Sequence, residues 1–243
     1  ERLGAAPLQP ELRKIDAIQT TKALAAEAGY LSSVAAGGPF DGNVSEDATE
    51  PGALVFQLVQ GGTLMADRDY YLREDAASVD LRAKYLLYLT TTFGLVSWTD
   101  AAADARAVLA LETELARAQL PRTDTRDTAI LKNRFQLSDL PKTLPGFDWT
   151  AWAKPQGINR VGAVIVSQPS FFKTFAALMQ TTPLSTWRAW LAIRYITSMS
   201  SSLSQPFERA RFEFFGRVLV NQEVPRARWK RGVGLVSAYL PDA

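Results

Sequence analysis

The sequence predicts a mainly α-helical fold, a multi-helix lobe with one small β-hairpin. Apolar residues recur every three or four positions through most of the 243 residues, which is typical of amphipathic helices. Strand-like runs of β-branched residues are short and lie next to glycines. The sequence contains no repeat of fixed period and no low-complexity stretch. We therefore interpret 1–243 as one helical domain.

The N-terminal part is predicted to hold helices followed by the hairpin. Pro10 suits the first turn of a helix, and Gly37-Gly38-Pro39 ends the helical pattern. Residues 54–59 form a strand-like run that stops at Gly61-Gly62, so we expect a hairpin over 43–60. The apolar residues at helical spacing before it are Leu12, Ile15, Ile18, Leu24, Ala28 and Leu31.

Two long helices are predicted in the centre of the chain, over 78–93 and 100–120. Thr99 is expected to cap the second helix, because its hydroxyl can accept a hydrogen bond from a free backbone N–H. Asp104 lies beside the apolar stripe of that helix and is expected to be solvated. The two stripes consist of Leu81, Tyr85, Tyr88, Leu89, Val108, Leu111, Leu115 and Ala118.

Residues 121–160 hold most of the prolines and glycines that indicate loops. Short helices are expected at 138–144 and 148–153, each opened by a capping side chain. The β-branched run at 161–166 suggests a strand.

The C-terminal part is predicted to be helical again. Pro169 begins a helix through Met179, and Ser185 or Thr186 caps another helix that runs to about 201. One further helix carries Phe207, Phe212, Phe215 and Leu219. A last amphipathic segment begins at 226 and carries Trp229, Val233 and Val236.

The composition excludes several kinds of chemistry. The chain has no histidine and no cysteine, which removes imidazole bases, thiolate nucleophiles and the commonest zinc ligands. A net charge of +2 does not indicate a nucleic-acid partner. No apolar run approaches the roughly 18–20 residues that span a bilayer. We therefore expect no catalytic residue, no metal ligand, no cofactor and no membrane span in this chain.

Several phrases of the sequence resemble a known family when they are taken in order. The segment 60–72 reads Gln-Gly-Gly-Thr-Leu-Met-Ala-Asp-Arg-Asp-Tyr-Tyr-Leu, where the family has glycines followed by Leu-Pro-Asp-Arg-Asp-Tyr-Tyr-Leu. Ala66 replaces the usual proline, which makes the turn less rigid. The other matching phrases are 12–24, Leu111-Glu112, Arg126-Asp127, 168–172, 184–191, 207–216 and 226–233. Together they resemble the N-terminal region of the neprilysin and endothelin-converting-enzyme family of zinc metallopeptidases.

The resemblance implies a non-catalytic role for this chain. The family's zinc site uses His-Glu-x-x-His on a helix with a downstream glutamate, and none of these residues can be placed here. Zinc is thus expected in a catalytic lobe of the same polypeptide, beyond the last residue of this sequence. In the family, the helical lobe encloses a cavity and admits oligopeptides, which the zinc lobe hydrolyses. The family also implies an extracytoplasmic location, periplasmic or secreted.

Two clusters are candidate inter-lobe or cleft residues: Arg68, Asp69 and Tyr70, and Arg228, Trp229 and Arg231. In the first cluster we expect Arg68 to hold the loop by pairing with a carboxylate or with backbone carbonyls. An acid–base pair or a calcium site at Asp67 and Asp69 is the alternative, which the spacing of two in an extended loop disfavours. The second cluster lies in the densest basic stretch, which also contains Arg226 and Lys230. It is interpreted either as a solvated helix face with Trp229 buried or as a charged seam against the other lobe. Contact with an anionic polymer is the third alternative.

Alternatives remain for the aromatic residues and for the function. The pairs Trp149/Trp152 and Trp187/Trp190 are expected in the core, and a cleft wall is the alternative. The chain could also be a stand-alone peptide-binding or scaffold protein. A hydrolase that uses only carboxylates is a third class, although no acid pair occupies a distinctive setting in the sequence.

Overall fold

The computed structural model describes residues 2–47, 50–126, 129 and 132–239, and it confirms a mainly helical fold. Asp127 and residues 240–243 lie outside the described residues. The long or central helices are α1 (Gln9–Asp16), α2 (Thr21–Ser33), α4 (Ala76–Leu95), α5 (Ala101–Ala118), α8 (Pro169–Thr181), α9 (Leu184–Met199), α10 (Gln205–Arg211) and α11 (Arg228–Tyr239). The short ones include α3 (Asp69–Leu72), α6 (Leu140–Thr143) and α7 (Trp149–Ala153).

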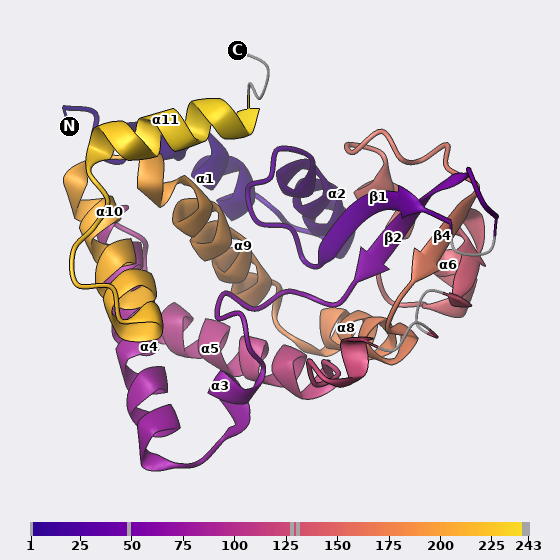
Figure 1. Cartoon of the computed structure of the whole chain (residues 1–243), viewed down its shortest axis with the longest axis horizontal. Coiled ribbons are helices and arrows are strands. Elements are labelled where there is room, and N and C mark those ends of the chain that lie inside the picture. Colours follow the sequence, from indigo (N-terminus) through magenta and orange to yellow (C-terminus); the bar gives the residue numbers. More distant parts are fainter. Residues whose placement is uncertain (1, 48–49, 127–128, 130–131, 240–243) are drawn as a thin grey trace.

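Helix α9 lies at the centre of the fold, with α1, α2, α4 and α5 packed around it (Figure 1). Its buried residues lie on every side of the helix, as expected for a helix that has neighbours all round. The four tryptophans of the two predicted pairs are each 1% exposed, so they belong to the core, as expected. Phe40 contacts several of these rings, including Trp152 at 4.9 Å between centroids.

The α2–α7 contact depends on one glycine. Gly29 of α2 lies so close to α7 that a Cβ at this position would be 2.1 Å from the backbone oxygen of Trp152. The start of α2 is fixed by Thr20, whose hydroxyl accepts a hydrogen bond from the Ala23 N–H at 3.1 Å. The two helix backbones can therefore approach this closely only because the residue at this position has no side chain.

The hairpin prediction is confirmed, but the hairpin belongs to a larger sheet. Strands β1 (Asp41–Glu46) and β2 (Leu54–Val59) pair antiparallel. Strand β4 (Ala163–Val166) lies within the predicted 161–166 and pairs parallel to β2, and β3 (Arg134–Gln136) pairs antiparallel to β4. The order is β1-β2-β4-β3. The β2–β4 pairing joins residues more than a hundred positions apart, such as Phe56 and Val164.

Four local predictions need correction. Asp100, not Thr99, precedes α5, and it does so in a left-handed conformation (φ 57°) that Asp tolerates better than most residues. Asp104 is not simply solvated, because it accepts a 2.7 Å hydrogen bond from the Trp98 indole. Pro183 precedes α9, so neither Ser185 nor Thr186 is its cap. Of the caps expected at 138 and 148, only the second is present: Asp148 accepts a capping hydrogen bond from the Ala151 N–H.

The predicted phenylalanine helix is continuous but changes its winding. Helix α10 passes directly into a π-helix (Phe212–Val218), within which Phe214 is buried. Phe214 packs on Tyr88 of α4 at 5.6 Å between ring centroids. Phe214 follows the buried Phe207 by seven positions, which is two turns of a regular helix, whereas Phe212 and Phe215 of the predicted set are only partly buried.

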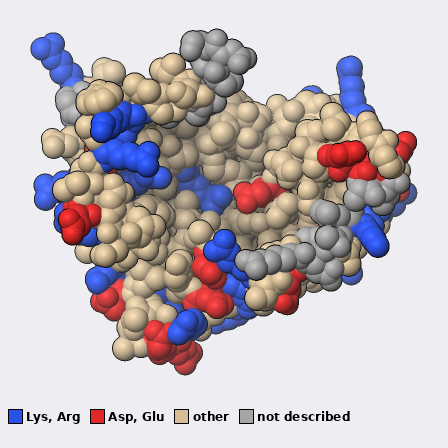
Figure 2. Space-filling model, in the orientation of Figure 1, with Lys and Arg blue, Asp and Glu red and all other residues tan. Residues whose placement is uncertain are grey.

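The elements form a curved body with two arms. Helices α4 and α10 form one arm, the sheet forms the other, and α5, α8 and α9 connect them (Figure 1). Figure 2 shows that this face is hollowed between the arms, with basic and acidic atoms inside the hollow. None of the helices described in this structure combines the length and the hydropathy that a membrane crossing requires.

Candidate functional site

The chain between β2 and α3 crosses the middle of the molecule and carries the family-like phrase of residues 60–72 (Figure 1). Hydrogen bonds from two helix regions fix its glycines. The Gln119 side-chain amide donates to the Gly61 carbonyl at 2.9 Å, and the Trp190 indole donates to the Gly62 carbonyl at 3.0 Å. Gly62 has a φ of +88°, and a Cβ here would lie 2.8 Å from the Pro39 oxygen. Only glycine fits this position without displacing the backbone.

A buried carboxylate fixes the next part of the same segment. Glu112 of α5 is 0% exposed and accepts hydrogen bonds from the Tyr71 hydroxyl at 2.7 Å and the Tyr85 hydroxyl at 2.6 Å. Its second oxygen accepts from the Leu64 N–H at 3.3 Å. Burial raises the pKa of Glu112, and the hydrogen bonds from the two tyrosines oppose this rise. One carboxylate of α5 therefore connects α4 with two parts of the 60–72 segment, Leu64 and the α3 residue Tyr71.

The sequence reasoning did not select Glu112 as a site residue, although a signal was present. It follows Val108 by four positions and precedes Leu115 by three, so it lies on the buried stripe of its own helix. An acidic residue on such a stripe indicates a buried and hydrogen-bonded carboxylate.

Arg68 fixes the end of the segment, in the way expected for a loop-holding arginine. Its guanidinium donates to the Gln119 backbone carbonyl, and its Nε lies 4.0 Å from the Asp69 carboxylate. The Asp69 N–H donates to the Asp67 side chain at 3.0 Å, while the Asp69 side chain itself is exposed. Asp67 therefore accepts from the backbone of the turn, while Asp69 lies beside Arg68, as expected for a structural role of this segment.

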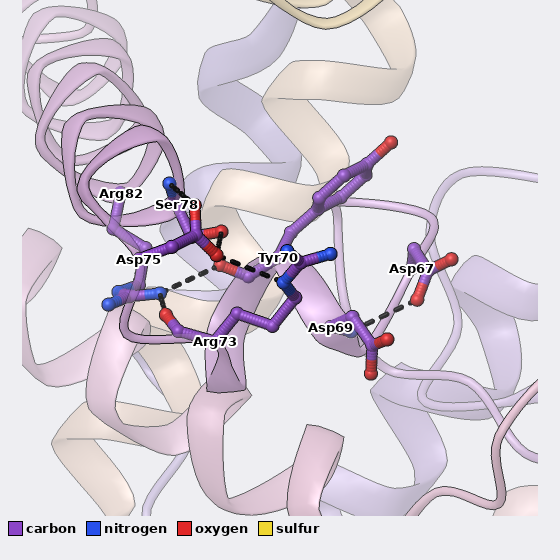
Figure 3. A network of polar contacts seen from close by, with 7 residues as sticks. All are labelled: Asp67, Asp69, Tyr70, Arg73, Asp75, Ser78 and Arg82. Atoms are coloured by element: carbon purple, nitrogen blue, oxygen red, sulfur yellow. Dashed lines mark hydrogen bonds and ion pairs between the residues drawn. The ribbon is translucent and has the colours of Figure 1, made fainter.

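Tyr70 lies at the edge of a polar network that leads into α4 (Figure 3). Its backbone carbonyl accepts from the Arg82 guanidinium at 3.1 Å, and Arg82 also donates to the Arg73 carbonyl at 2.6 Å. Asp75 caps α4 by accepting from the Ser78 N–H at 3.1 Å. In Figure 3 the Tyr70 ring points away from this network. Arg68, Asp69 and Tyr70 thus lie together on one stabilised turn, with the Tyr70 ring half-buried.

The second predicted cluster lies on α11, away from this turn. Arg231 forms a two-pronged ion pair with Glu208 of α10, and Arg228 donates to the Leu203 carbonyl at 3.4 Å. Trp229 is 68% exposed, so the interpretation that buried its ring in a solvated helix face is wrong. Val233 and Val236 are exposed as well. Helix α11 is held at its N-terminal end by charge and presents apolar side chains to solvent.

Arg194 and Asp41 are two further charged residues that the sequence reasoning missed, and the charge of Arg194 acts on the Asp41 carboxyl. Arg194 is 9% exposed, lies over the Trp190 ring at 4.9 Å, and donates from Nε to the Gly37 carbonyl at 3.3 Å. Asp41 begins β1, and the surrounding protein raises its pKa while the charge of Arg194 opposes this rise. Helix α9 is apolar on all sides, so periodicity does not single out its one buried arginine.

The donor set does not fit zinc. The chain has neither imidazole nor thiolate, and no three acidic side chains of the described residues gather where they could hold a metal ion. No metal-dependent step is assigned to the residues of this site.

Comparisons with known proteins place these features in a family context. The sequence model of peptidase family M13 matches residues 1–243. The chain is 28% identical over 210 residues to an endothelin-converting enzyme homolog of Locusta migratoria, across 80% of this chain. It is 24% identical over 194 residues to endothelin-converting enzyme 1 of Homo sapiens, across 77% of this chain.

A solved structure is similar over nearly the whole chain. The zinc metalloprotease Zmp1 of Mycobacterium tuberculosis in its open state matches with a TM-score of 0.94 and 31% identity across 99% of this chain. The alignment covers only 38% of the Zmp1 chain. Likewise, this chain spans 28% of the locust relative and 25% of the human one.

Proposed function

Because the chain belongs to peptidase family M13, we propose that it is the helical, non-catalytic lobe of a neprilysin-like zinc metalloendopeptidase. In this role it encloses the active-site cavity and restricts substrates to short peptides. The observation that carries the proposal is the similarity to Zmp1, a zinc metalloprotease, across 99% of this chain but only 38% of that enzyme. The remaining part of such an enzyme supplies the zinc site and the peptide-bond hydrolysis.

Selection of substrates by size requires a rigid surface around the cavity. The 60–72 segment is fixed at Gly61, Gly62, Leu64 and Arg68 by contacts to α5 and α9, and the hollow of Figure 2 lies between two packed arms. A flexible peptide can lie along such a surface, whereas a folded domain cannot enter an enclosed space of this kind. Structures of Zmp1 described as open and as partially open support lobes that move relative to each other.

The two residue clusters then have separate parts in the assembly. The exposed apolar face of α11, with Trp229 between Arg228 and Arg231, is the contact with the catalytic lobe. Trp and Arg are the residue types that most often dominate such contacts. Arg68, Asp69 and Tyr70 lie on the cleft side, where Arg68 and Asp69 position the turn and the Tyr70 ring contacts the peptide. We place the whole enzyme outside the cytoplasm, in the periplasm or secreted.

The test compares the purified chain with the polypeptide that contains both lobes. The chain alone is expected to cleave no peptide, and the two-lobe protein is expected to cleave short peptides but not folded proteins, in an EDTA-sensitive way. EDTA-insensitive cleavage by the chain alone would refute the proposal. A coding sequence that reaches a His-Glu-x-x-His helix after residue 243 supports it, and a stop codon there supports a stand-alone peptide-binding scaffold.

A further inference from the structure

Two glutamates on neighbouring N-terminal helices face each other with no hydrogen-bond donor between them. Glu11 of α1 is 7% exposed, and Glu27 of α2 is half-buried. In each residue the Oε1 atom is buried and has no hydrogen-bond partner, and the two side chains lie within hydrogen-bonding reach of each other. Two ionised carboxylates cannot satisfy one another, because both are acceptors.

We propose that Glu11 and Glu27 share one proton, and that this proton joins α1 to α2 and makes the stability of the lobe depend on pH near neutrality. The shared proton makes one carboxyl a donor and the other an acceptor. Each of the two buried Oε1 atoms then has a hydrogen-bond partner. Helices α1 and α2 each pack against α9, so the bridge completes a three-helix contact. This inference does not rest on the proposed function.

The surrounding charges determine which glutamate holds the proton. Lys14 donates to the other oxygen of Glu11 at 2.8 Å and lies over the Tyr30 ring at 5.2 Å. Tyr195 of α9 is the further titratable group that faces Glu11, Lys14 and Tyr30, and α7 contributes none between 149 and 153. The ammonium favours charge on Glu11, so the proton resides on Glu27.

The pKa values of the two glutamates agree with a proton on Glu27 and a charge on Glu11. Burial, together with the hydrogen bond and charge of Glu11, raises the pKa of Glu27 to about 8. Burial alone would also raise the pKa of Glu11, but hydrogen bonds from Glu27 and Lys14 and the charge of Lys14 bring it below its ordinary value.

The direction in which stability changes with pH follows from the raised pKa of Glu27. Between the ordinary pKa of 4.5 and about 8, folded Glu27 keeps a proton that unfolded Glu27 releases. The contribution of Glu27 to stability is therefore complete below pH 4.5, falls as the pH rises through this window, and is absent above pH 8. For one proton, the limiting change in the unfolding equilibrium constant is about tenfold per pH unit.

The experiment measures urea unfolding of the full chain by tryptophan fluorescence between pH 5 and 8, for the parent, Glu27→Gln and Glu114→Gln. Glutamine keeps a donor toward Glu11 but cannot titrate, while Glu114 is an exposed glutamate of α5 and serves as the control. The ratio of the unfolding constants of parent and Glu27→Gln is expected to rise with pH, by up to about tenfold per unit. Other titrating groups, such as Asp41 and Glu112, cancel in this ratio because both proteins contain them.

For Glu114→Gln, the corresponding ratio is expected to stay constant across the same pH range. A ratio for Glu27→Gln that also stays constant would overturn the proposal.

A second measurement follows the titration of Glu27 directly in the parent. Carbon-13 NMR of the glutamate carboxyl groups in the parent should show Glu27 titrating with a midpoint near 8, and Lys14→Met should raise this midpoint further by removing the charge that opposes it. A Glu27 midpoint close to 4.5 in the parent would overturn the shared proton.

Discussion

Glu112 illustrates how a single residue can connect several elements. A charge in a fully buried position is tolerated here because two tyrosine hydroxyls and one backbone N–H donate to it. The buried carboxylate specifies where the 60–72 segment and α3 lie against α5. The same residue shows how a polar side chain on an apolar stripe can be a structural requirement of the fold.

We predict that Glu112→Ala destabilises the chain by about 3 kcal/mol or more, because it leaves two buried hydroxyls and a backbone N–H without an acceptor. Urea unfolding at constant pH measures the free energy of unfolding. Glu114→Ala, on the exposed side of the same helix, is the matched control and should change this free energy by less than about 0.5 kcal/mol. Equal effects of the two variants would contradict a central role for Glu112.

At the scale of elements, the helices are held together by close approaches and the sheet by long-range pairing. Gly29 allows α2 to reach the backbone of α7, and Gly62 allows the 60–72 segment to pass Pro39. Helix α11 differs from these elements, since Arg231 and Arg228 attach its first turns to α10 and the preceding chain while its apolar face stays exposed. Packing is thus tight around α9 and incomplete at α11.

The importance of the α2–α7 approach can be tested with two Gly→Ala variants of opposite expected sign. Gly94→Ala in α4 meets no atom within 4 Å and should stabilise the chain by up to about 1 kcal/mol through helix propensity. Gly29→Ala should instead destabilise it by about 2 kcal/mol or more, because the added methyl group would lie 2.1 Å from the Trp152 oxygen. Thermal or urea unfolding distinguishes the two outcomes, and stabilisation by both variants would show that α2 can shift without cost.

At the scale of the whole molecule, this chain has a well-packed core and an exposed apolar face on α11. Its aromatic core is buried within the chain, whereas Trp229, Val233 and Val236 of α11 form an apolar face that the described residues leave uncovered. Other apolar residues, such as Leu54 of β2 and Leu87 of α4, are exposed as well. Under the proposed function, the catalytic lobe covers this face.

This assignment predicts different effects of Trp229→Ala in the chain and in the two-lobe protein. In the chain alone the free energy of unfolding should change by less than about 0.5 kcal/mol, because the ring is already in water. In the two-lobe protein the substitution should weaken the contact between lobes by about 2 kcal/mol, seen as a lower Tm and reduced peptide cleavage. Val79→Ala, an exposed apolar residue of α4, is the control. An unchanged two-lobe protein would place the inter-lobe contact elsewhere.

By itself, the sequence determined the helical class, the order of the long helices, the hairpin, the aromatic core and the inability to ligate zinc through imidazole or thiolate. These follow from local periodicity and from composition, which need no knowledge of neighbours in space. Only the tertiary structure decided that 163–166 pairs with 54–59, that Glu112 receives two tyrosines and that Glu11 faces Glu27. Each of these depends on contacts between separate elements, and residues that meet only after the chain has packed leave no local pattern from which the contact can be deduced.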